Sequence, residues 1–331
     1  MDIDRMMPLS RRLVALLASG ERWLRADLAA ALGVEIEAVD ALLSALVKTG
    51  SAMVVSGVDV GLPGAIELLE RDFIWAQLAS DVAGVLNRFD VAGVVTSTNA
   101  VLLADVGGAW PAVSVLMAEG QSAGRGRTAR RWHSPLGTHV YLSMVFKWTK
   151  PLIALGGFTP ALGIGMARAL RRCGVAHVKV KWPNDLFHED AKMAGVLVET
   201  RTLSSHEHRV VVGVGINVGA DRLGIDVGQA HTSVSVAANV DMSRNLVATW
   251  IIDAMYRTFE DFARHGLDGF LDDWRGFDYF AGNPVRAVGR AGTIHGVCRG
   301  LARDGGLLLD CAGSTITVTA GEVSLRAAGG T

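Results

Sequence analysis

The first 62 residues alternate apolar and polar positions with a helical period. Leucine, valine and alanine recur three or four positions apart near 8–19, 25–32 and 35–48, and Gly20 and Gly33 follow the first two segments. The second segment, the turn at Gly33 and the third segment have the spacing of a helix-turn-helix. Residues 52–60 are β-rich and predict a short hairpin, the wing. The whole stretch therefore predicts a winged helix-turn-helix.

From residue 65 onward, short β-rich runs alternate with longer helical segments. Strands are predicted at 93–96, 113–118, 139–146, 175–182, 194–200 and 210–218, and helices at 155–172 and 246–264. This pattern is typical of one α/β (α+β) domain. After a break at 280–284, five short runs between 285 and 325 predict a small β-barrel. The expected domains are 1–64, 65–278 and 279–331.

Composition and charge exclude several classes of protein. The 32 basic and 33 acidic side chains leave a net charge of −1, which argues against a general polyanion binder. No apolar run reaches about 20 residues without a charge or turn signal, so no membrane span is expected. Three widely spaced cysteines fit neither a disulfide framework nor a zinc site. With no signal peptide apparent, the expected location is cytoplasmic.

The third predicted helix is acidic where a DNA-reading helix carries basic or amide side chains. It holds Glu35, Glu37 and Asp40, and its one basic residue, Lys48, lies at the far end. Acidic side chains are repelled by phosphates. The charge pattern therefore favours a packing or regulatory role for this domain over DNA binding.

The segment 118–132 combines glycines with a cluster of arginines. Arg125 and Arg127 alternate with glycines, and Arg130 and Arg131 follow, in a chain with almost no net charge. Glycines let backbone N–H groups turn towards an anion, and guanidinium groups hold phosphate oxygens. The spacing is not that of a P-loop. We interpret the segment, called the arginine loop below, as an anion-binding loop, with an exposed solvated loop as the alternative.

A second candidate lies at 179–199. Pro183 requires extended backbone before it, and Asn184 and Asp185 then follow at a strand end. Asp185 has the chemistry of a general base or a magnesium ligand, and an ordinary turn is the alternative. Lys192 precedes an apolar strand and points either into a pocket or into solvent.

The glycines of 213–219 resemble a dinucleotide-binding loop at first sight. That motif requires a third glycine and a helix directly afterwards, but Asn217 and Val218 occupy this space. We interpret Gly213 and Gly215 as room for a flat ligand against a strand. The stretch 206–208, His-Glu-His, is interpreted as a solvated hairpin tip, because no third metal ligand lies near it in sequence.

The order of these motifs resembles that of the biotin–protein ligases over nearly the whole chain. The motifs are Ser97-Thr98-Asn99, Gly124-Arg125-Gly126-Arg127 with Trp132, Lys181-Trp182-Pro183-Asn184-Asp185, Lys192-x-Ala194-Gly195 and Gly213-x-Gly215-Ile216-Asn217. The resemblance implies a central mixed-sheet domain of the biotin/lipoate ligase type between a winged helix-turn-helix and an SH3-like barrel. It also implies biotin, ATP and Mg²⁺, a biotinoyl-adenylate intermediate, and a carrier-protein lysine as acceptor.

The same resemblance assigns roles to individual residues. Lys192, Arg127 and Asp185 would be catalytic, with Asp185 also a magnesium ligand. The biotin site would comprise Ser97, Thr98, Asn99, Gln121, Gly124, Trp132, Ser143, Gly195, Gly213 and Gly215. The adenylate site would comprise Arg125, Arg127, Trp132, Asn184, Lys192, Asn217, Glu322 and Arg326.

The resemblance has one local departure and leaves two further functions open. Where the family's arginine loop has a glycine two positions after the second arginine, this chain has Ala129. Bifunctional relatives of this type are also biotin-responsive repressors, with dimerisation and DNA binding. A lipoate–protein ligase shares the general fold, but the arginine loop argues against it.

Overall fold

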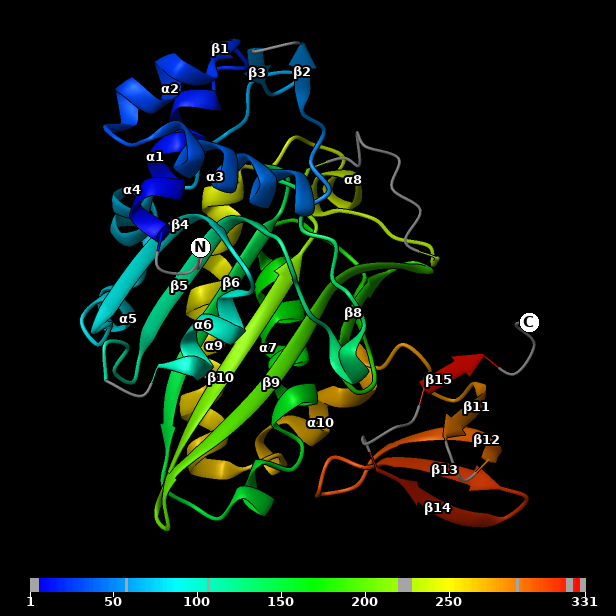
Figure 1. The fold of residues 1–331 in the computed structure, drawn as a ribbon. Helices are drawn as coiled ribbons and strands as arrows, with labels where there is room; N and C mark the ends of the chain where they lie inside the picture. Colours follow the sequence, from blue (N-terminus) through cyan, green and yellow to red (C-terminus); the bar gives the residue numbers. More distant parts are fainter. Residues whose placement is uncertain are drawn as a thin grey trace.

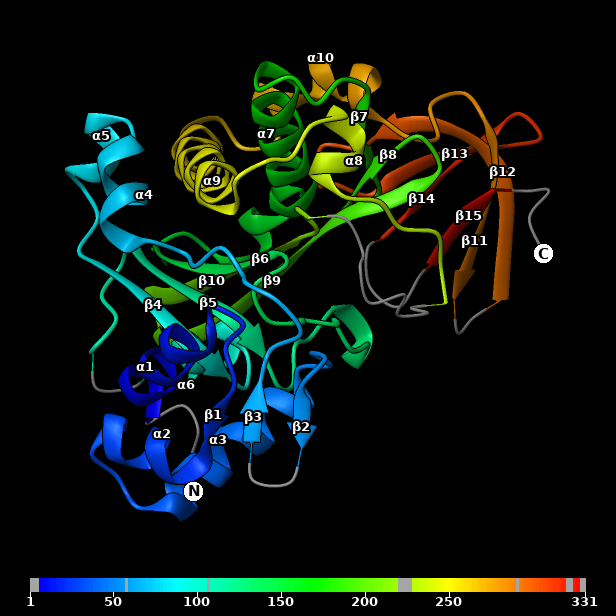
Figure 2. The same cartoon turned by 90° about the horizontal axis from the view of Figure 1, so that it is seen from above.

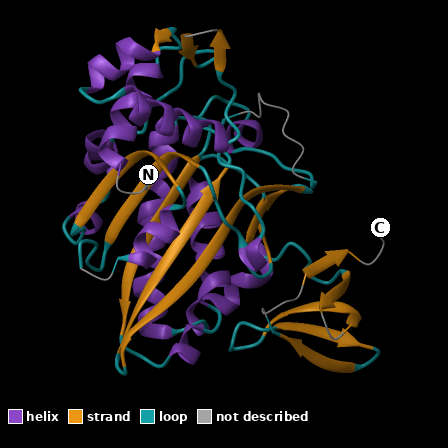
Figure 3. Ribbon diagram, in the orientation of Figure 1, coloured by secondary structure: helices purple, strands orange, loops and turns teal. Residues whose placement is uncertain are grey.

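The computed structural model describes residues 6–56, 59–105, 108–219, 228–289, 292–319 and 324–327. Three units follow one another along the chain (Figures 1 and 3): a helical unit with a small sheet, a large mixed α/β unit, and a C-terminal antiparallel sheet. The predicted fold class of mixed α/β is therefore confirmed.

The N-terminal unit has three helices, as the periodicity predicts. They are α1 (Met7–Leu17), α2 (Arg25–Leu32) and α3 (Ile36–Lys48). Their leucine stripes meet in one core, in which Leu13, Leu28 and Leu42 are buried. The predicted hairpin is formed by β2 (Val54–Ser56) and β3 (Asp59–Gly61). A two-residue strand, β1 (Trp23–Leu24), pairs with β3 and was not predicted.

The central unit is built on a seven-stranded sheet with the order β4-β5-β6-β10-β9-β8-β7. Only β4 and β5 run parallel to each other, and all other neighbours are antiparallel. The strands are β4 (Arg88–Val95), β5 (Ser114–Gln121), β6 (Val140–Trp148), β7 (Val178–Lys181), β8 (Asp185–His188), β9 (Ala191–Ser204) and β10 (Glu207–Ile216). Six of these strands were predicted. The four-residue β8 was not predicted.

Helices cover both faces of this sheet (Figure 2). The long helices α7 (Phe158–Arg172) and α9 (Arg244–His265) lie with α10 (Asp268–Phe277) on one face, while α1 and α6 (Thr98–Ala104) lie on the other. Short helices α4 (Arg71–Gln77), α5 (Ser80–Ala83) and α8 (Val234–Ala238) complete the unit. The core includes Phe146 stacked on Phe259, with ring centroids 4.1 Å apart.

One segment of the described chain, Leu152–Arg172, is long and apolar enough to cross a membrane by length and composition alone. It contains α7, whose apolar stripe is buried against the sheet and against α9. The segment is therefore accounted for as a core helix of this fold.

The C-terminal unit is a five-stranded antiparallel sheet with the order β14-β13-β12-β11-β15. Its strands are β11 (Pro284–Gly289), β12 (Gly292–Leu301), β13 (Leu307–Cys311), β14 (Ser314–Val318) and β15 (Ser324–Ala327). Within the described ranges no pairing joins β14 to β15, so the structure shows an open sheet and not the closed barrel of the prediction.

Specific contacts join the C-terminal sheet to the central unit. The indole Nε1 of Trp182 donates to the Gly305 carbonyl at 2.9 Å. Asp278 is 3% exposed at the junction, where it accepts hydrogen bonds from Trp274 Nε1 at 3.1 Å and from the Phe280 N–H at 2.9 Å. Burial raises the pKa of the Asp278 carboxyl.

The N-terminal unit is docked closely on the sheet. A Cβ on Gly93 of β4 would lie 2.2 Å from the Ser10 carbonyl oxygen, so only glycine permits this approach of α1. Glu119 of β5 is fully buried and accepts from Arg11 of α1 and from Arg244 of α9, the latter at 2.6 Å. Two arginines from different units therefore neutralise one buried carboxylate.

Candidate functional site

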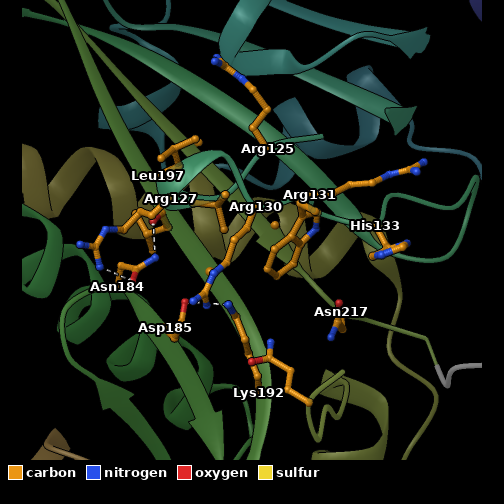
Figure 4. A pocket seen from close by; sticks show the side chains of 18 of the residues that line it. Arg125, Arg127, Arg130, Arg131, His133, Asn184, Asp185, Lys192, Leu197 and Asn217 are labelled. Carbon is orange, nitrogen blue, oxygen red and sulfur yellow. Dashed lines mark hydrogen bonds and ion pairs between the residues drawn. The ribbon is translucent and has the colours of Figure 1, made fainter. Parts of the chain in front are cut away.

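A cavity of about 820 Å³ lies at the end of the central sheet, between the arginine loop, the β7–β8 corner and β15. It collects residues that are far apart in sequence (Figure 4). The predicted site residues that line it are Ser97, Thr98, Asn99, Gln121, Arg125, Arg127, Trp132, Asn184, Asp185, Lys192, Gly195, Gly213, Gly215, Asn217 and Arg326.

The floor of the cavity is a network of buried polar side chains. Gln121, at the end of β5, accepts the Thr98 N–H at 2.9 Å and donates to Ser134 Oγ at 2.9 Å. The Ser143 hydroxyl on β6 lies 2.7 Å from Thr98 Oγ1 and 2.6 Å from Asn99 Oδ1. Each of these side chains is less than one-tenth exposed, and Thr98, Asn99 and Gln121 line the cavity, so a ligand there would meet their polar atoms.

One wall is the indole of Trp132 lying against bare backbone. A Cβ on Gly215 of β10 would come within 2.4 Å of the ring, and one on Gly195 of β9 within 3.0 Å. Among the described residues, Trp132 Nε1 is one of the few buried polar atoms with no hydrogen-bond partner. An unmet buried donor costs about 1–3 kcal/mol, so this N–H is available to a ligand acceptor.

The arginine loop folds back on itself above the cavity. The Gly126 N–H donates to the Arg130 carbonyl at 2.7 Å, and Arg125 pairs with Arg131 in a short antiparallel bridge. Arg131 in turn donates to the Lys48 carbonyl, at the end of α3, at 2.7 Å. The loop is therefore held by its own backbone and by the N-terminal unit.

Arg127 is the loop's cation that reaches deepest. Its guanidinium donates to Asn184 Oδ1 at 3.2 Å, and the two side chains point at each other in Figure 4. Asn184 is itself fixed by donating to the Val196 carbonyl at 3.0 Å. Burial, reinforced by the charge of Arg130, lowers the pKa of Arg127. An anion in the cavity would relieve this repulsion between two cations.

Lys192 and Asp185 form the charged centre of the cavity. The Lys192 Nζ lies 2.9 Å from Asp185 Oδ1 and 5.1 Å from the centre of the Trp132 ring. The Lys192 backbone bonds to Ala230 and Thr232, which fixes its place at the start of β9. Of the two orientations left open by the sequence, the structure therefore shows the one into the pocket.

Asn217, at the end of β10, is held by backbone on both sides. Its N–H donates to the Met193 carbonyl at 2.9 Å, and its side chain donates to the Thr232 carbonyl at 3.0 Å. Its carboxamide oxygen stays available to the cavity that it lines.

Two predicted site residues, Gly124 and Ser143, do not line the described cavity. Gly124 lies beneath the loop, where a Cβ would meet the Trp132 carbonyl at 2.6 Å, and Ser143 lies behind Thr98 and Asn99. Glu322 lies outside the described residues. Asp185 was expected at a strand end or in a turn, but it is the first residue of β8 and pairs with Lys181 across the corner.

Lys181 is a lining residue that the sequence did not single out as a site residue. Its ammonium lies over three rings, with centroid distances of 4.8 Å to Phe187, 5.6 Å to Phe280 and 6.0 Å to Tyr279. Burial lowers the pKa of Lys181, and Asp185 opposes this shift. Lys181 opens the motif of residues 181–185, but the rings come from β8 and from residues 279–280, which only the fold brings together.

Arg130 and Arg131, which the sequence placed in the arginine cluster without a site role, also line the cavity. Further lining residues have no signal of their own in the chain, among them His133, His139 and His231. Within the described ranges no group of three His, Cys, Asp or Glu side chains could hold a metal ion. The His-Glu-His stretch lies at the β9–β10 turn, as predicted.

Comparison with known families places this geometry among enzymes of one kind. Residues 91–217 match the biotin/lipoate A/B protein ligase family, and residues 280–326 match the biotin protein ligase C-terminal domain. The bifunctional ligase/repressor BirA of Salmonella typhimurium is 35% identical over 98% of this chain and 99% of its own length. The biotin–[acetyl-CoA-carboxylase] ligase of Mycobacterium tuberculosis is 31% identical over 71% of this chain and 88% of its own.

Solved structures give the same result. The biotin protein ligase from Aquifex aeolicus in complex with biotin and ATP has a TM-score of 0.63 and 26% sequence identity. The match covers 73% of this chain and 100% of that chain.

Proposed function

Because the chain belongs to the biotin protein ligase family, we propose that it joins biotin to ATP and then transfers biotin to a protein lysine. The first step gives biotinoyl-5′-AMP and pyrophosphate, and the acceptor is a lysine of a biotin carboxyl carrier protein. One observation carries the proposal. A single cavity joins a neutral hydrogen-bonding floor to a group of cations, as an uncharged ureido ring and a phosphate chain require.

The cations fit the first half-reaction. A carboxylate attacks an α-phosphate, so two anions must approach each other and charge develops on the phosphate oxygens. Arg127 and Lys192 both line the cavity, where they contact the adjacent residues Asn184 and Asp185, and would stabilise that charge without reorganising. Arg125, Asn184, Asn217 and Arg326 are proposed to contact the adenylate from the surrounding walls.

The floor and the Trp132 wall fit biotin. Thr98, Asn99 and Gln121 are proposed to pair with the ureido group, supported by Ser97 and Ser143. The fused ring and tail would lie against the Trp132 indole, which is itself packed on the bare backbone of Gly195 and Gly215, whereas the space at Gly213 is taken by the Asn99 carboxamide. The unmet Trp132 N–H would bond to the adenylate.

The described residues suit a magnesium ion that arrives with ATP better than a resident one. Asp185 is the carboxylate beside the cation cluster, and Mg²⁺ is commonly held by one or two carboxylates together with substrate phosphates. Asp185 would hold the ion, which neutralises phosphate charge when bound. In the second half-reaction Asp185 is placed to accept a proton from the incoming lysine.

We also propose that the chain has three domains with different roles, at residues 1–64, 65–278 and 279–331. Three helices and a three-stranded sheet fit a winged helix-turn-helix, and the five antiparallel strands of the C-terminal unit fit an SH3-like barrel that is open between β14 and β15 in the described residues. The central unit would carry both reactions. Arg326 of β15 lines the cavity, so the C-terminal unit would complete the ATP site, with Glu322 as a further candidate.

The deciding experiment is biotin-dependent labelling of a purified acceptor domain with ATP and Mg²⁺. Labelled acceptor that needs all three components is the expected result. If no biotin-dependent adenylate or labelled acceptor forms, the proposal is wrong. Competition between biotin and lipoate in the same assay separates this activity from lipoate ligation, and we expect biotin alone to be used.

A second candidate function is transcriptional repression, because a relative matching 98% of the chain is a bifunctional ligase/repressor. The structure supplies a physical argument against it. Glu35, Glu37 and Asp40 are exposed on α3, the helix that would enter the DNA groove. We expect no gel shift on operator-like DNA, with or without biotin and ATP. A biotin-dependent shift would establish the repressor function.

A further inference from the structure

Glu199 of β9 has no role in the proposed reaction, yet it touches both halves of the site. Its Oε2 accepts from Asn99 Nδ2 at 2.9 Å and from the Arg125 guanidinium at 3.1 Å. Asn99 belongs to the polar floor and Arg125 to the arginine loop. One carboxylate oxygen therefore connects the buried end of the cavity to the loop above it.

The Asn99 carboxamide is held in place on every side. It is 3% exposed, and its Nδ2 also lies 3.3 Å from the Leu197 carbonyl. A Cβ on Gly213 would lie 2.2 Å from Asn99 Oδ1, so the amide rests directly on the β10 backbone. In this position the side chain has two orientations, which differ by exchange of its oxygen and nitrogen.

Glu199, at the shorter distance, and the Leu197 carbonyl together select one of these two orientations. A carboxylate only accepts hydrogen bonds, so the Asn99 NH₂ group faces Glu199 and its oxygen faces Ser143. A hydroxyl has a single proton and a carboxamide oxygen only accepts, so the Ser143 proton goes to Asn99. With the Ser143 proton committed to Asn99, the 2.7 Å contact between Ser143 and Thr98 draws on the Thr98 proton, for which Gln121 Oε1 at 3.3 Å is the competing acceptor.

The result is a floor whose hydrogen bonds run in one direction. With its proton committed to Ser143, Thr98 Oγ1 presents lone pairs to the cavity that it lines. A ring that carries N–H donors, as the ureido group of biotin does, meets an acceptor there. If Asn99 were reversed, its NH₂ group would point at Ser143 and this order would be lost.

We propose that Glu199 is a positioning residue for biotin recognition, which acts by orienting Asn99 and thereby the protons of Ser143 and Thr98. The inference rests on the proposed function and extends it to the floor's preference for N–H donors. Glu199 itself need not touch biotin.

The test uses Glu199→Gln, which keeps the size of the side chain but adds donors that let Asn99 reverse. Calorimetry with biotin alone should show binding weakened by about tenfold or more, the usual effect of leaving buried polar groups mismatched. In steady-state labelling, KM for biotin should rise while kcat at saturating biotin stays near that of the parent. The matched control is Glu207→Gln, whose carboxylate pairs with Lys147 at 2.7 Å on the neighbouring strand, away from the cavity.

A double-mutant cycle with Ser143→Ala separates positioning from general support of the fold. If Glu199 acts through Ser143, the two losses in biotin affinity should be clearly less than additive. Additive losses, or parent-like biotin binding by Glu199→Gln, would overturn the proposal. If the parent protein itself shows no biotin-dependent labelling, the proposed function fails, whatever the Glu199 variant does.

Discussion

Replacing Lys192 by methionine removes the charge at the centre of the cavity and leaves a chain of similar length. The Lys192 side chain is 14% exposed, with its Nζ 2.9 Å from Asp185 Oδ1 and 5.1 Å from the Trp132 ring centre. Methionine can keep the packing on Trp132. The variant therefore isolates the ammonium group from the bulk of the side chain.

The expected loss is large for catalysis and small for stability. Removing one preorganised group that stabilises developing charge costs about 10²–10³ in kcat. The Asp185 carboxylate left behind is 22% exposed, so solvent can reach it. The free energy of unfolding should then fall by about 1 kcal/mol, below the 3–5 kcal/mol typical of a broken fully buried pair.

Biotin-dependent exchange of pyrophosphate into ATP measures the first half-reaction, and urea denaturation measures stability. The loss could also arise because Asp185, once unpaired, repels ATP. The double variant Lys192→Met/Asp185→Asn removes that repulsion. We expect it to remain slow, whereas recovery to near the parent rate would show that Lys192 only neutralises Asp185. An unchanged rate in Lys192→Met alone would refute the assignment.

Three further changes test other parts of the site. Gly215→Ala places a Cβ within 2.4 Å of the Trp132 ring, so the affinity for biotin measured by calorimetry should fall by about tenfold or more. The control is Gly276→Ala, which has open space at its Cβ and should leave the affinity for biotin unchanged. Arg127→Gly removes the contact to Asn184, and the adenylate should escape about tenfold faster in a chase experiment; retention equal to the parent would contradict this. Burial raises the pKa of Asp278, so the folded state holds this proton more tightly than the unfolded chain. The free energy of unfolding should then fall as pH rises from the ordinary carboxyl range through the raised pKa. Asp278→Asn should be less stable but show a smaller pH dependence in urea titrations from about pH 4 to 7, and an equal dependence would assign it to another group.

Strong periodicity made most of the fold predictable. The helices α2 and α9 follow apolar stripes, and their observed bounds lie within two residues of those expected. The strand β8 was missed because four residues after Pro183 carry no period of their own. It exists because β7 and β9 pair with it on both sides. The sequence predicted a barrel from the spacing of strands, but closure depends on pairing, which spacing does not determine.

The candidate site divides in the same way. Residues in local motifs, such as Lys192 and the Gly213–Gly215 pair, could be selected from the sequence because charge or missing side chains mark them. The rings around Lys181 and the carboxylate of Glu199 could not. These groups matter for the site because of contacts between strands that are distant in sequence, and no neighbouring residue in the chain indicates those contacts.

The buried carboxylate of Glu119 has a consequence for the mechanics of the molecule. Because arginines from α1 and α9 meet on it, separating the N-terminal helices from the sheet would leave one buried charge with half its neutralising partners. The chain is predicted to divide near residue 64, but this carboxylate ties the two parts together. We expect the N-terminal unit and the central unit to unfold in a single cooperative transition, so the N-terminal helices and the ligand cavity should be lost at the same temperature.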